Sequence, residues 1–301
     1  MSRVLVSGAT GLIGAALSTA LEAQGAQVVR LVRGQSHSPA EIAWNPMAKE
    51  PGAGPPSSMV SGFDAVVHLA GESIVGRWTE AKKRAIRDSR VRSTRNLATV
   101  LPWTESKPKV FVCASAIGFY GDRGEEILTE QSSSGGGFLA EVCREWEAAS
   151  QIAAGGGIRT VNLRTGLVLS ANGGALGKML TPFKLGLGGR IGSGKQWWSW
   201  IHIDDMVGGI LHALATESVV GPVNMVAPQT VRNDDFTKTL ASVLGRPALF
   251  PVPRFALRLT FAKLAADELF LASQHVKPEK LTASGYRFQF PDLRAALESL
   301  V

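Results

Sequence analysis

Three glycines near the start of the chain, Gly8, Gly11 and Gly14, have the spacing that binds the diphosphate of a dinucleotide. They lie between an apolar segment, residues 4–7, and an amphipathic segment, residues 12–23. Glycine permits a tight turn, and its missing Cβ lets the backbone approach the diphosphate at the positive end of the following helix. The pattern therefore predicts a dinucleotide site with the loop residues Gly8, Thr10, Gly11, Leu12, Ile13 and Gly14.

The end of the second predicted strand, residues 27–33, carries the side chain that would choose between two dinucleotides. An NAD(H) site usually has an acidic residue there, about 20 residues after the glycine loop, to bind the ribose 2′-hydroxyl. This chain instead has Arg33, with no acid close by. A guanidinium can pair with a 2′-phosphate through two N–H groups. We therefore expect NADP(H) with Arg33 as the selector; the alternative is that Arg33 is only a surface charge.

Strands and helices must alternate to position these residues. Apolar runs predict buried strands, and amphipathic runs between them predict helices. A polar segment rich in proline and glycine, residues 34–62, predicts a long loop with a short strand near residues 42–44. This alternation indicates an α/β fold with a Rossmann-type, doubly wound parallel sheet. The strands are expected at residues 4–7, 27–33, 65–70, 110–114, 160–163 and 223–226, and the helices at residues 12–23, 78–101 and 138–153.

The pattern changes after Gly166. Residues 171–194 are rich in glycine, which predicts loops over a ligand cleft. Residues 201–215 predict a strand end followed by a helix, with Asp204 or Asp205 as its N-cap. We expect an NADP-binding Rossmann domain from residues 1–167 with residues 199–228, and a smaller C-terminal substrate lobe from residues 168–198 and 229–301.

Composition narrows the classes of partner. The 301 residues are 45% hydrophobic and 19% charged, and the two cysteines are too few for a disulfide framework or a zinc site of their own. The net charge of +7 is compatible with binding to nucleic acid or to a membrane surface. However, the one basic cluster, between Arg77 and Arg95, is interrupted by Glu80 and Asp88, which is typical of a solvated helix face. No secretory pattern precedes the first strand. We therefore expect a cytoplasmic protein that binds a small-molecule substrate, with no metal, nucleic-acid or membrane partner, and the helix at residues 78–101 leaves a homodimer open.

Several further segments resemble the extended short-chain dehydrogenases/reductases. The resemblance to the superfamily is carried by the glycine run, the strand end at residues 67–71 and the strand end at residues 114–116. Within it, the chain is similar to the epimerase-like subgroup called SDR39U1-like, whose members are described as predicted nucleoside-diphosphate-sugar epimerases. The segments that carry this closer resemblance are residues 71–74, 89–90, 115–121, 200–205 and 274–278.

The resemblance implies cofactor contacts beyond the glycine loop. Two strand ends would line the cofactor, and a charged pair would lie close to it, with the arginine of that pair near a phosphate. These residues are Leu69, Ala70 and Gly71 on the first strand end, Ala114 and Ser115 on the second, and the pair Glu72 and Arg90. Close packing is the alternative role for the small residues.

The chain departs from the superfamily where the resemblance would place its proton relay. The superfamily uses a Ser or Thr with a Tyr-x-x-x-Lys pair, in which the lysine lowers the tyrosine pKa so that the phenol can exchange a proton with the substrate. Ser115 matches the first member, but Phe138 and Val142 occupy the positions of the pair. The two tyrosines, Tyr120 and Tyr286, form no such motif. The usual relay is therefore absent.

Substitute site residues are suggested by position. Tyr120 closely follows the strand that carries Ser115, so the two are candidate catalytic residues, although Tyr120 is equally well explained as a wall residue. Arg164, at a strand end near the expected cleft, is a candidate ligand for a substrate anion. Trp200 is a candidate for stacking on the substrate, with core packing as the alternative.

These expectations combine into one leading function. The chain is expected to be an NADP-dependent short-chain oxidoreductase or epimerase with a degenerate Tyr-Lys pair, acting on an unknown small substrate, with sugar nucleotides as one candidate class. Hydride transfer at the nicotinamide would be the chemistry, with Ser115 polarising the substrate oxygen. The alternative is a non-catalytic sensor or scaffold protein that binds NADP(H) but has lost the relay.

Overall fold

A parallel sheet of seven strands forms the centre of the protein, as seen in the computed structural model, which describes residues 2–50 and 54–301. Its spatial order is β3-β2-β1-β4-β5-β7-β11, and every neighbouring pair is parallel. The strand order reverses between β1 and β4, the place where such sheets bind ligands at the carboxyl ends of the strands. The strands are β1 (Arg3–Ser7), β2 (Gln27–Val32), β3 (Glu41–Ala43), β4 (Ala65–His68), β5 (Val110–Ala116), β7 (Arg159–Thr165) and β11 (Gly221–Met225).

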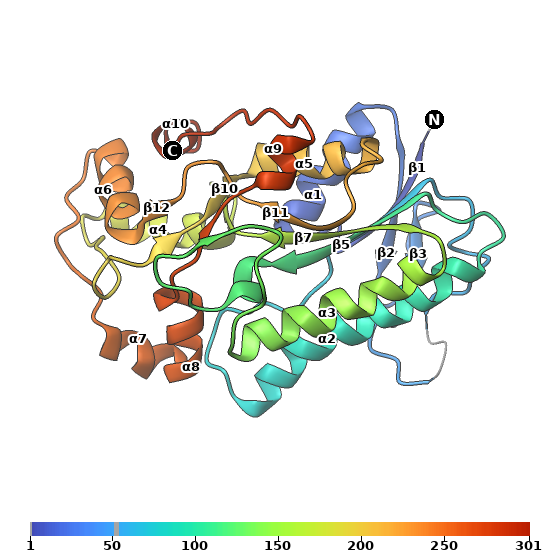
Figure 1. Ribbon diagram of the computed structural model, residues 1–301, viewed down its shortest axis with the longest axis horizontal. Coiled ribbons are helices and arrows are strands. Elements are labelled where there is room, and N and C mark those ends of the chain that lie inside the picture. The colour runs from blue at the N-terminus through green and yellow to red at the C-terminus, as the bar shows by residue number, and fades with distance from the viewer. Residues whose placement is uncertain (1, 51–53) are drawn as a thin grey trace.

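Helices cover both faces of this sheet (Figure 1). On one face, α1 (Leu12–Ala23) and α5 (Ile203–Ala215) bury a core that includes Leu17 and Ile210. On the other face, α2 (Glu80–Val100) and α3 (Phe138–Gly155) lie side by side over a core that includes Leu97 and Trp146. Because both faces are covered, the central strands are buried on both sides and read as continuous apolar runs.

A second group of elements lies beyond the carboxyl end of the sheet, on the left in Figure 1. Its own core includes Leu176, Leu180, Trp200 and Phe236. Three short strand pairs connect it to the rest of the chain: β8 (Leu167–Leu169) with β10 (Trp200–His202), β9 (Trp197–Trp198) with β12 (Val231–Arg232), and β6 (Ile127–Leu128) with β13 (His275–Val276). The helices of this half are α4 (Gly174–Lys184), α6 (Asn233–Leu244), α7 (Arg254–Phe261), α8 (Lys263–Ala266) and α10 (Leu293–Glu298), whereas α9 (Glu279–Ala283) packs on β11 beside α5. Single turns of irregular helix complete the chain at η1 (Leu101–Trp103), η2 (Ile117–Tyr120) and η3 (Asp267–Leu271).

The structure confirms the doubly wound parallel sheet and corrects the expectation for residues 171–194. This glycine-rich segment contains α4 rather than loops alone, because Leu176, Leu180 and Phe183 recur at helical spacing and are buried. The short strand expected near residues 42–44 is present as β3. Within the loop expected at residues 34–62, residues 51–53 lie outside the described residues. The division into a Rossmann domain and a substrate lobe stays a prediction.

The expected N-cap of α5 is also corrected. His202, not Asp204 or Asp205, caps this helix, because its Nδ1 accepts the Asp204 N–H at 3.1 Å. Asp205 is instead fully buried and holds the C-terminal segment. Its carboxylate accepts hydrogen bonds from the Tyr286 hydroxyl at 2.9 Å and from the N–H groups of Gln289 and Phe290, both at 2.8 Å. An acid that the sequence suggested as a local cap is thus a long-range connection.

Candidate functional site

The loop between β1 and α1 is shaped by close backbone contacts at two glycines. Gly8 has a φ of 72°, a left-handed conformation that favours glycine. A Cβ on Gly14 would lie 2.2 Å from the carbonyl oxygen of Gly8, so only glycine fits at that position. The Gly11 N–H donates to the same oxygen at 3.0 Å, and α1 then begins at Leu12 with no side chain capping its N-terminus. The first turn of α1 therefore has unsatisfied N–H groups that can bind an anion.

A cavity of about 310 Å³ lies at this N-terminus. The sequence predicted part of its lining: Gly8, Gly11, Leu12, Ile13, Gly14, Leu69 and Ala114. The rest was missed and comes from the end of β7, from β8 and from the start of α4: Thr165, Gly166, Leu167, Val168, Gly174 and Ala175. Thr165 contributes the one polar side chain among these lining residues. The cavity is thus an apolar slot with a helix N-terminus at one wall.

A cluster of cations surrounds one carboxylate near the end of β2. Glu72, just after β4, lies 2.6 Å from the Lys82 ammonium, and its N–H donates to the Ser89 hydroxyl at 2.9 Å. The hydrogen bond from Lys82, with the charges of Lys82, Arg90 and Arg33, lowers the pKa of Glu72. Arg33 itself is exposed. The predicted residues Arg33, Glu72 and Arg90 are therefore brought together, with positive charge in excess.

Ser115 has its hydroxyl directed away from the cavity. This side chain is buried and donates to Oε1 of Glu147 on α3 at 2.7 Å. Arg164 makes two hydrogen bonds to the same carboxylate, both 2.8 Å long, and is 4% exposed. Arg164 is thus already neutralised, which argues against binding of a substrate anion. The roles of both residues stay predictions, and Glu147 is a partner that the sequence reasoning missed.

Tyr120 lies in the core, which corrects its expected position at the cleft. The residue is fully buried, and its hydroxyl lies 2.7 Å from Oδ1 of Asn224 and 2.9 Å from the carbonyl oxygen of Thr129, either of which can accept its proton. Arg164 donates to the phenol oxygen at 3.0 Å. Burial raises the pKa of Tyr120, the opposite of what a proton relay requires. This geometry argues against the predicted catalytic role.

The start of α3, where the superfamily pattern places the Tyr-Lys pair, is held by the C-terminal half of the chain. The carboxylate of Glu268 accepts the N–H groups of Phe138 at 2.9 Å and Leu139 at 2.8 Å. Phe138 also packs edge-on against Trp78, with ring centroids 5.1 Å apart, and Val142 is buried. A carboxylate thus occupies the positive end of this helix, a contact between distant segments that the sequence did not reveal.

Trp200 is fully buried in the core of the second group of elements, which argues against its expected place beside a substrate. Its Nε1 has no hydrogen-bond partner among residues 2–50 and 54–301. The neighbouring Trp197 stacks on His275 at 4.2 Å between ring centroids and donates to Glu125 at 2.9 Å. Stacking of Trp200 on a ligand stays a prediction that this burial does not favour.

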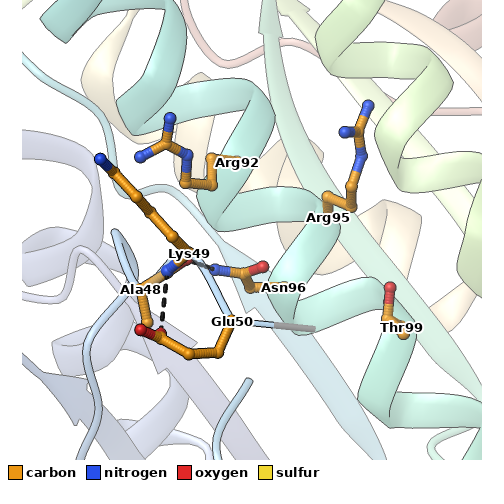
Figure 2. A pocket seen from close by; sticks show the side chains of 7 residues that line it. All are labelled: Ala48, Lys49, Glu50, Arg92, Arg95, Asn96 and Thr99. Atoms are coloured by element: carbon orange, nitrogen blue, oxygen red, sulfur yellow. Dashed lines mark hydrogen bonds between the residues drawn. The ribbon is translucent and has the colours of Figure 1, made fainter. Parts of the chain in front are cut away.

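A second cavity of about 310 Å³ lies elsewhere, between α2 and the loop that precedes the undescribed residues (Figure 2). It shares no lining residue with the glycine-loop cavity and is rich in exposed cationic side chains. Its lining is Ala48, Lys49, Glu50, Arg92, Arg95, Asn96 and Thr99. The Asn96 amide donates to the carbonyl oxygens of Pro46 and Ala48. We therefore infer that this side of α2 serves to hold the loop that contains these two residues.

Two general searches of the described residues are relevant to partners. Residues 2–50 and 54–301 contain no group of three or more His, Cys, Asp or Glu side chains placed to hold a metal ion. Within the same part of the chain, no helix combines the length and apolar character needed to cross a membrane. The cytoplasmic location and the homodimer stay predictions.

The parallel sheet reverses its strand order between β1 and β4, and at that point a glycine loop leads into a helix without a side-chain cap and a cavity lies beside it. These features define the class of dinucleotide-binding Rossmann proteins. Within this class, the chain belongs to the NAD dependent epimerase/dehydratase family, whose model matches residues 4–226. A second family model, described as a domain of unknown function (DUF1731), matches residues 252–300.

Known proteins are similar over the whole chain. The human epimerase family protein SDR39U1 is 39% identical over 307 residues, which cover 99% of each chain. A crystal structure of the human protein (isoform 2) with NADPH has a TM-score of 0.90 at 37% identity, covering 99% of this chain and 98% of that one. A Corynebacterium glutamicum structure described as a nucleoside-diphosphate sugar epimerase has a TM-score of 0.81 at 38% identity, and 58% of its length is covered. The expected resemblance to the SDR39U1-like subgroup is thereby confirmed.

Proposed function

We propose that this protein binds NADP(H) and catalyses hydride transfer on a small-molecule substrate without a Tyr-Lys pair. The glycine-loop cavity carries the proposal, because it joins an unsatisfied helix N-terminus to an apolar slot at the reversal point of the sheet. The excess positive charge around Arg33 fits a cofactor with a 2′-phosphate. The NADPH in the crystal structure of the human relative supports the same choice.

Different residues of the chain bind different parts of this cofactor. The first turn of α1 binds the diphosphate, and Arg33 binds the 2′-phosphate. Ala114, which lines the cavity, leaves room for the nicotinamide half because its side chain is small. When bound, NADP(H) supplies or accepts a hydride at its nicotinamide ring. The apolar walls made by Leu167 and Val168 exclude water from that place.

Proton handling must differ from that of the wider superfamily. Ser115 is the proposed group that polarises the substrate oxygen, and its proton is directed to Glu147, so it acts only after exchanging that hydrogen bond. Thr165 lines the cavity directly, with its hydroxyl donating to the Leu163 carbonyl oxygen at 3.1 Å. The Thr165 hydroxyl can accept a hydrogen bond from a substrate without leaving its present partner, whereas the Ser115 hydroxyl must first turn away from Glu147.

The relatives indicate only a broad class of substrate. A structure described as a nucleoside-diphosphate sugar epimerase matches the chain at 38% identity, so sugar nucleotides are the first compounds to test. Simple carbonyl compounds are the second set, because they need the fewest contacts outside the cavity.

Parallel calorimetric titration of the purified protein with NADPH and NADH tests the proposal. We expect NADPH to bind at least tenfold more tightly, a difference of about 1.4 kcal/mol. Incubation with NADPH carrying deuterium at the transferable position, and each compound set, should then give a deuterated product. A folded protein that binds neither dinucleotide would overturn the proposal. Tight NADPH binding with no transfer to any compound would favour the non-catalytic alternative.

Tyr120→Phe separates a structural from a catalytic role for that residue. We expect the variant to lose about 1–3 kcal/mol of unfolding free energy, because Asn224, Thr129 and Arg164 lose a buried partner. NADPH affinity and turnover of the folded protein should be unchanged. Urea unfolding and the titration above measure the two effects. Loss of turnover at full stability would restore the catalytic assignment of Tyr120.

A further inference from the structure

Six large apolar side chains are exposed at one end of the molecule. They come from the turn after α4, from the loop between α6 and α7, and from α7 itself, which lie on the left in Figure 1. Each is between 57% and 76% exposed. Single exposed apolar residues are common, but a group of neighbouring ones marks an interaction surface. We name this group the apolar tip; its members are Leu185, Leu187, Leu249, Phe250, Phe255 and Leu259.

Backbone contacts hold the segments of the apolar tip side by side. The Phe250 N–H donates to the Gly188 carbonyl oxygen at 3.2 Å, and the Val252 N–H donates to the Arg190 carbonyl oxygen at 2.8 Å. The loop before α7 therefore runs along the turn that follows α4. The chain then enters α7 at Arg254, directly after these contacts. The exposed apolar side chains of all three segments thus belong to one neighbouring set.

The helix α7 carries apolar residues on its outward side as well as on its inward side. Leu257 is buried, whereas Phe255 and Leu259 are exposed. Residues four apart lie on the same side of a helix, and Leu257, midway between them, lies on the opposite side. The outward side of a surface helix is normally polar. In the part of the chain that the structure describes, nothing covers the outward side of α7.

All charged residues of the two stretches that form the apolar tip are cationic. Residues 184–190 and 246–264 contain six lysines and arginines and no acidic residue, so most of the net charge of +7 is concentrated there. All six are exposed. Among residues 2–50 and 54–301, only one of the six makes a salt bridge, Arg258 with Asp267. The six cations are Lys184, Arg190, Arg246, Arg254, Arg258 and Lys263.

The occupant of this surface must be negatively charged and must accept protruding apolar side chains. A second copy of the chain would bring the same cations against these six, which is repulsive. A protein segment that docks on apolar residues needs a groove, and neither cavity described above is lined by a residue of the apolar tip. We propose that the apolar tip inserts into the surface of an anionic lipid bilayer, with its cations at the headgroups. Such binding needs no spanning helix.

This proposal departs from the expectation of no membrane partner. That expectation considered a single run of sequence, the basic cluster of α2, which acidic residues interrupt. The cations of the apolar tip come instead from two distant stretches, residues 184–190 and 246–264, which the fold brings together. Anionic headgroups attract each cation, and the inserted apolar side chains hold the protein at the interface.

Co-sedimentation of the purified full chain with vesicles tests the proposal. We expect binding to vesicles of equal parts phosphatidylcholine and phosphatidylglycerol to be at least about tenfold stronger than binding to phosphatidylcholine alone. Phe255→Ser combined with Leu259→Ser should weaken binding to the mixed vesicles at least about tenfold, because two apolar side chains leave the interface. Trp103→Ser is the control: Trp103 is also exposed, but it follows the end of α2 that lies away from α7 in Figure 1, and it should bind normally.

A second pair of variants tests the cations. Arg246→Gln combined with Arg254→Gln should weaken binding to the mixed vesicles about tenfold, because two charges leave the headgroup region. Arg92→Gln combined with Arg95→Gln makes the same change in net charge at the separate cavity of Figure 2 and should bind normally. Equal losses in the two double variants would overturn the proposal, because net charge alone would then explain the binding.

Thermal melting shows whether each variant is folded, and Leu249→Ser combined with Phe250→Ser replaces the α7 variant if that one unfolds. Unchanged vesicle binding in the folded serine variants would overturn the proposal. Sedimentation equilibrium without vesicles addresses the other occupants. Self-association that the serine variants abolish would assign the apolar tip to a second copy of the chain. A folded monomer that binds neither kind of vesicle would also overturn the proposal and would favour an acidic protein partner.

Discussion

Replacing Arg33 with glutamate is expected to weaken NADPH binding about 100-fold and to leave NADH binding within a few-fold of its starting value. The guanidinium at the end of β2 would lose its charge-assisted hydrogen bonds to the 2′-phosphate, which contribute about 1.5–3 kcal/mol. A carboxylate in its place adds repulsion and can accept a hydrogen bond from the 2′-hydroxyl of NADH. Each 1.4 kcal/mol is tenfold in affinity. Isothermal titration of both dinucleotides measures the switch.

The exposure of Arg33 makes this test clean, because the side chain can be changed without disturbing the core. Arg95→Glu is the matched control: it makes the same change in net charge on an exposed residue of α2 that lines the separate cavity of Figure 2. Equal losses of NADPH affinity in the two variants would show that the effect comes from the change in net charge and not from a contact between Arg33 and the 2′-phosphate. An Arg33→Glu protein that binds NADPH normally would show that Arg33 is only a surface charge.

The sheet and its helices were predictable because parallel strands buried on both faces leave continuous apolar runs in the sequence. Residues 65–68, Ala-Val-Val-His, are all buried in β4, and α1 spans the same residues, 12–23, as its amphipathic pattern predicted. Such signals are local. The glycines of residues 171–194 concealed a helix, although Leu176, Leu180 and Phe183 recur at helical spacing and carried the signal that was missed.

The orientation of Ser115 was also available from the sequence. Successive side chains of a strand point to opposite faces, so Ala114 and Ser115 cannot both face the cofactor. The structure places Ala114 in the cavity lining and directs Ser115 to α3. A strict two-residue alternation along β5 would have assigned one residue, not both, to the nicotinamide.

The buried polar network could not be predicted in this way. Glu147 joins Ser115 from 32 residues away, and Glu268 binds the N–H of Phe138 from 130 residues away. No periodicity links such pairs, because their contact depends on how the helices are placed by the whole core. The same reason explains why Tyr120, close in sequence to the predicted cleft, meets Asn224 in the core.

Gly14→Ala is expected to abolish measurable NADPH binding, with an affinity loss of at least about 100-fold. The added Cβ would lie 2.2 Å from the Gly8 oxygen and 2.9 Å from the Ala9 Cα, and both are backbone atoms that cannot rotate away. The glycine loop must therefore move, which displaces the N–H groups that hold the diphosphate. Losing two such charge-assisted bonds accounts for the expected factor. Overpacking should also lower the free energy of unfolding by about 1–3 kcal/mol.

Gly155→Ala is the control for this substitution. It makes the same chemical change in the last turn of α3, where an added Cβ meets no atom within 4 Å, and it should bind NADPH normally. Calorimetric titration beside urea unfolding separates binding from stability for both variants. Normal NADPH affinity in a folded Gly14→Ala protein would mean that the loop tolerates the shift, and that the diphosphate does not depend on the α1 N-terminus. The cavity would then need another ligand, because its remaining walls are apolar apart from Thr165.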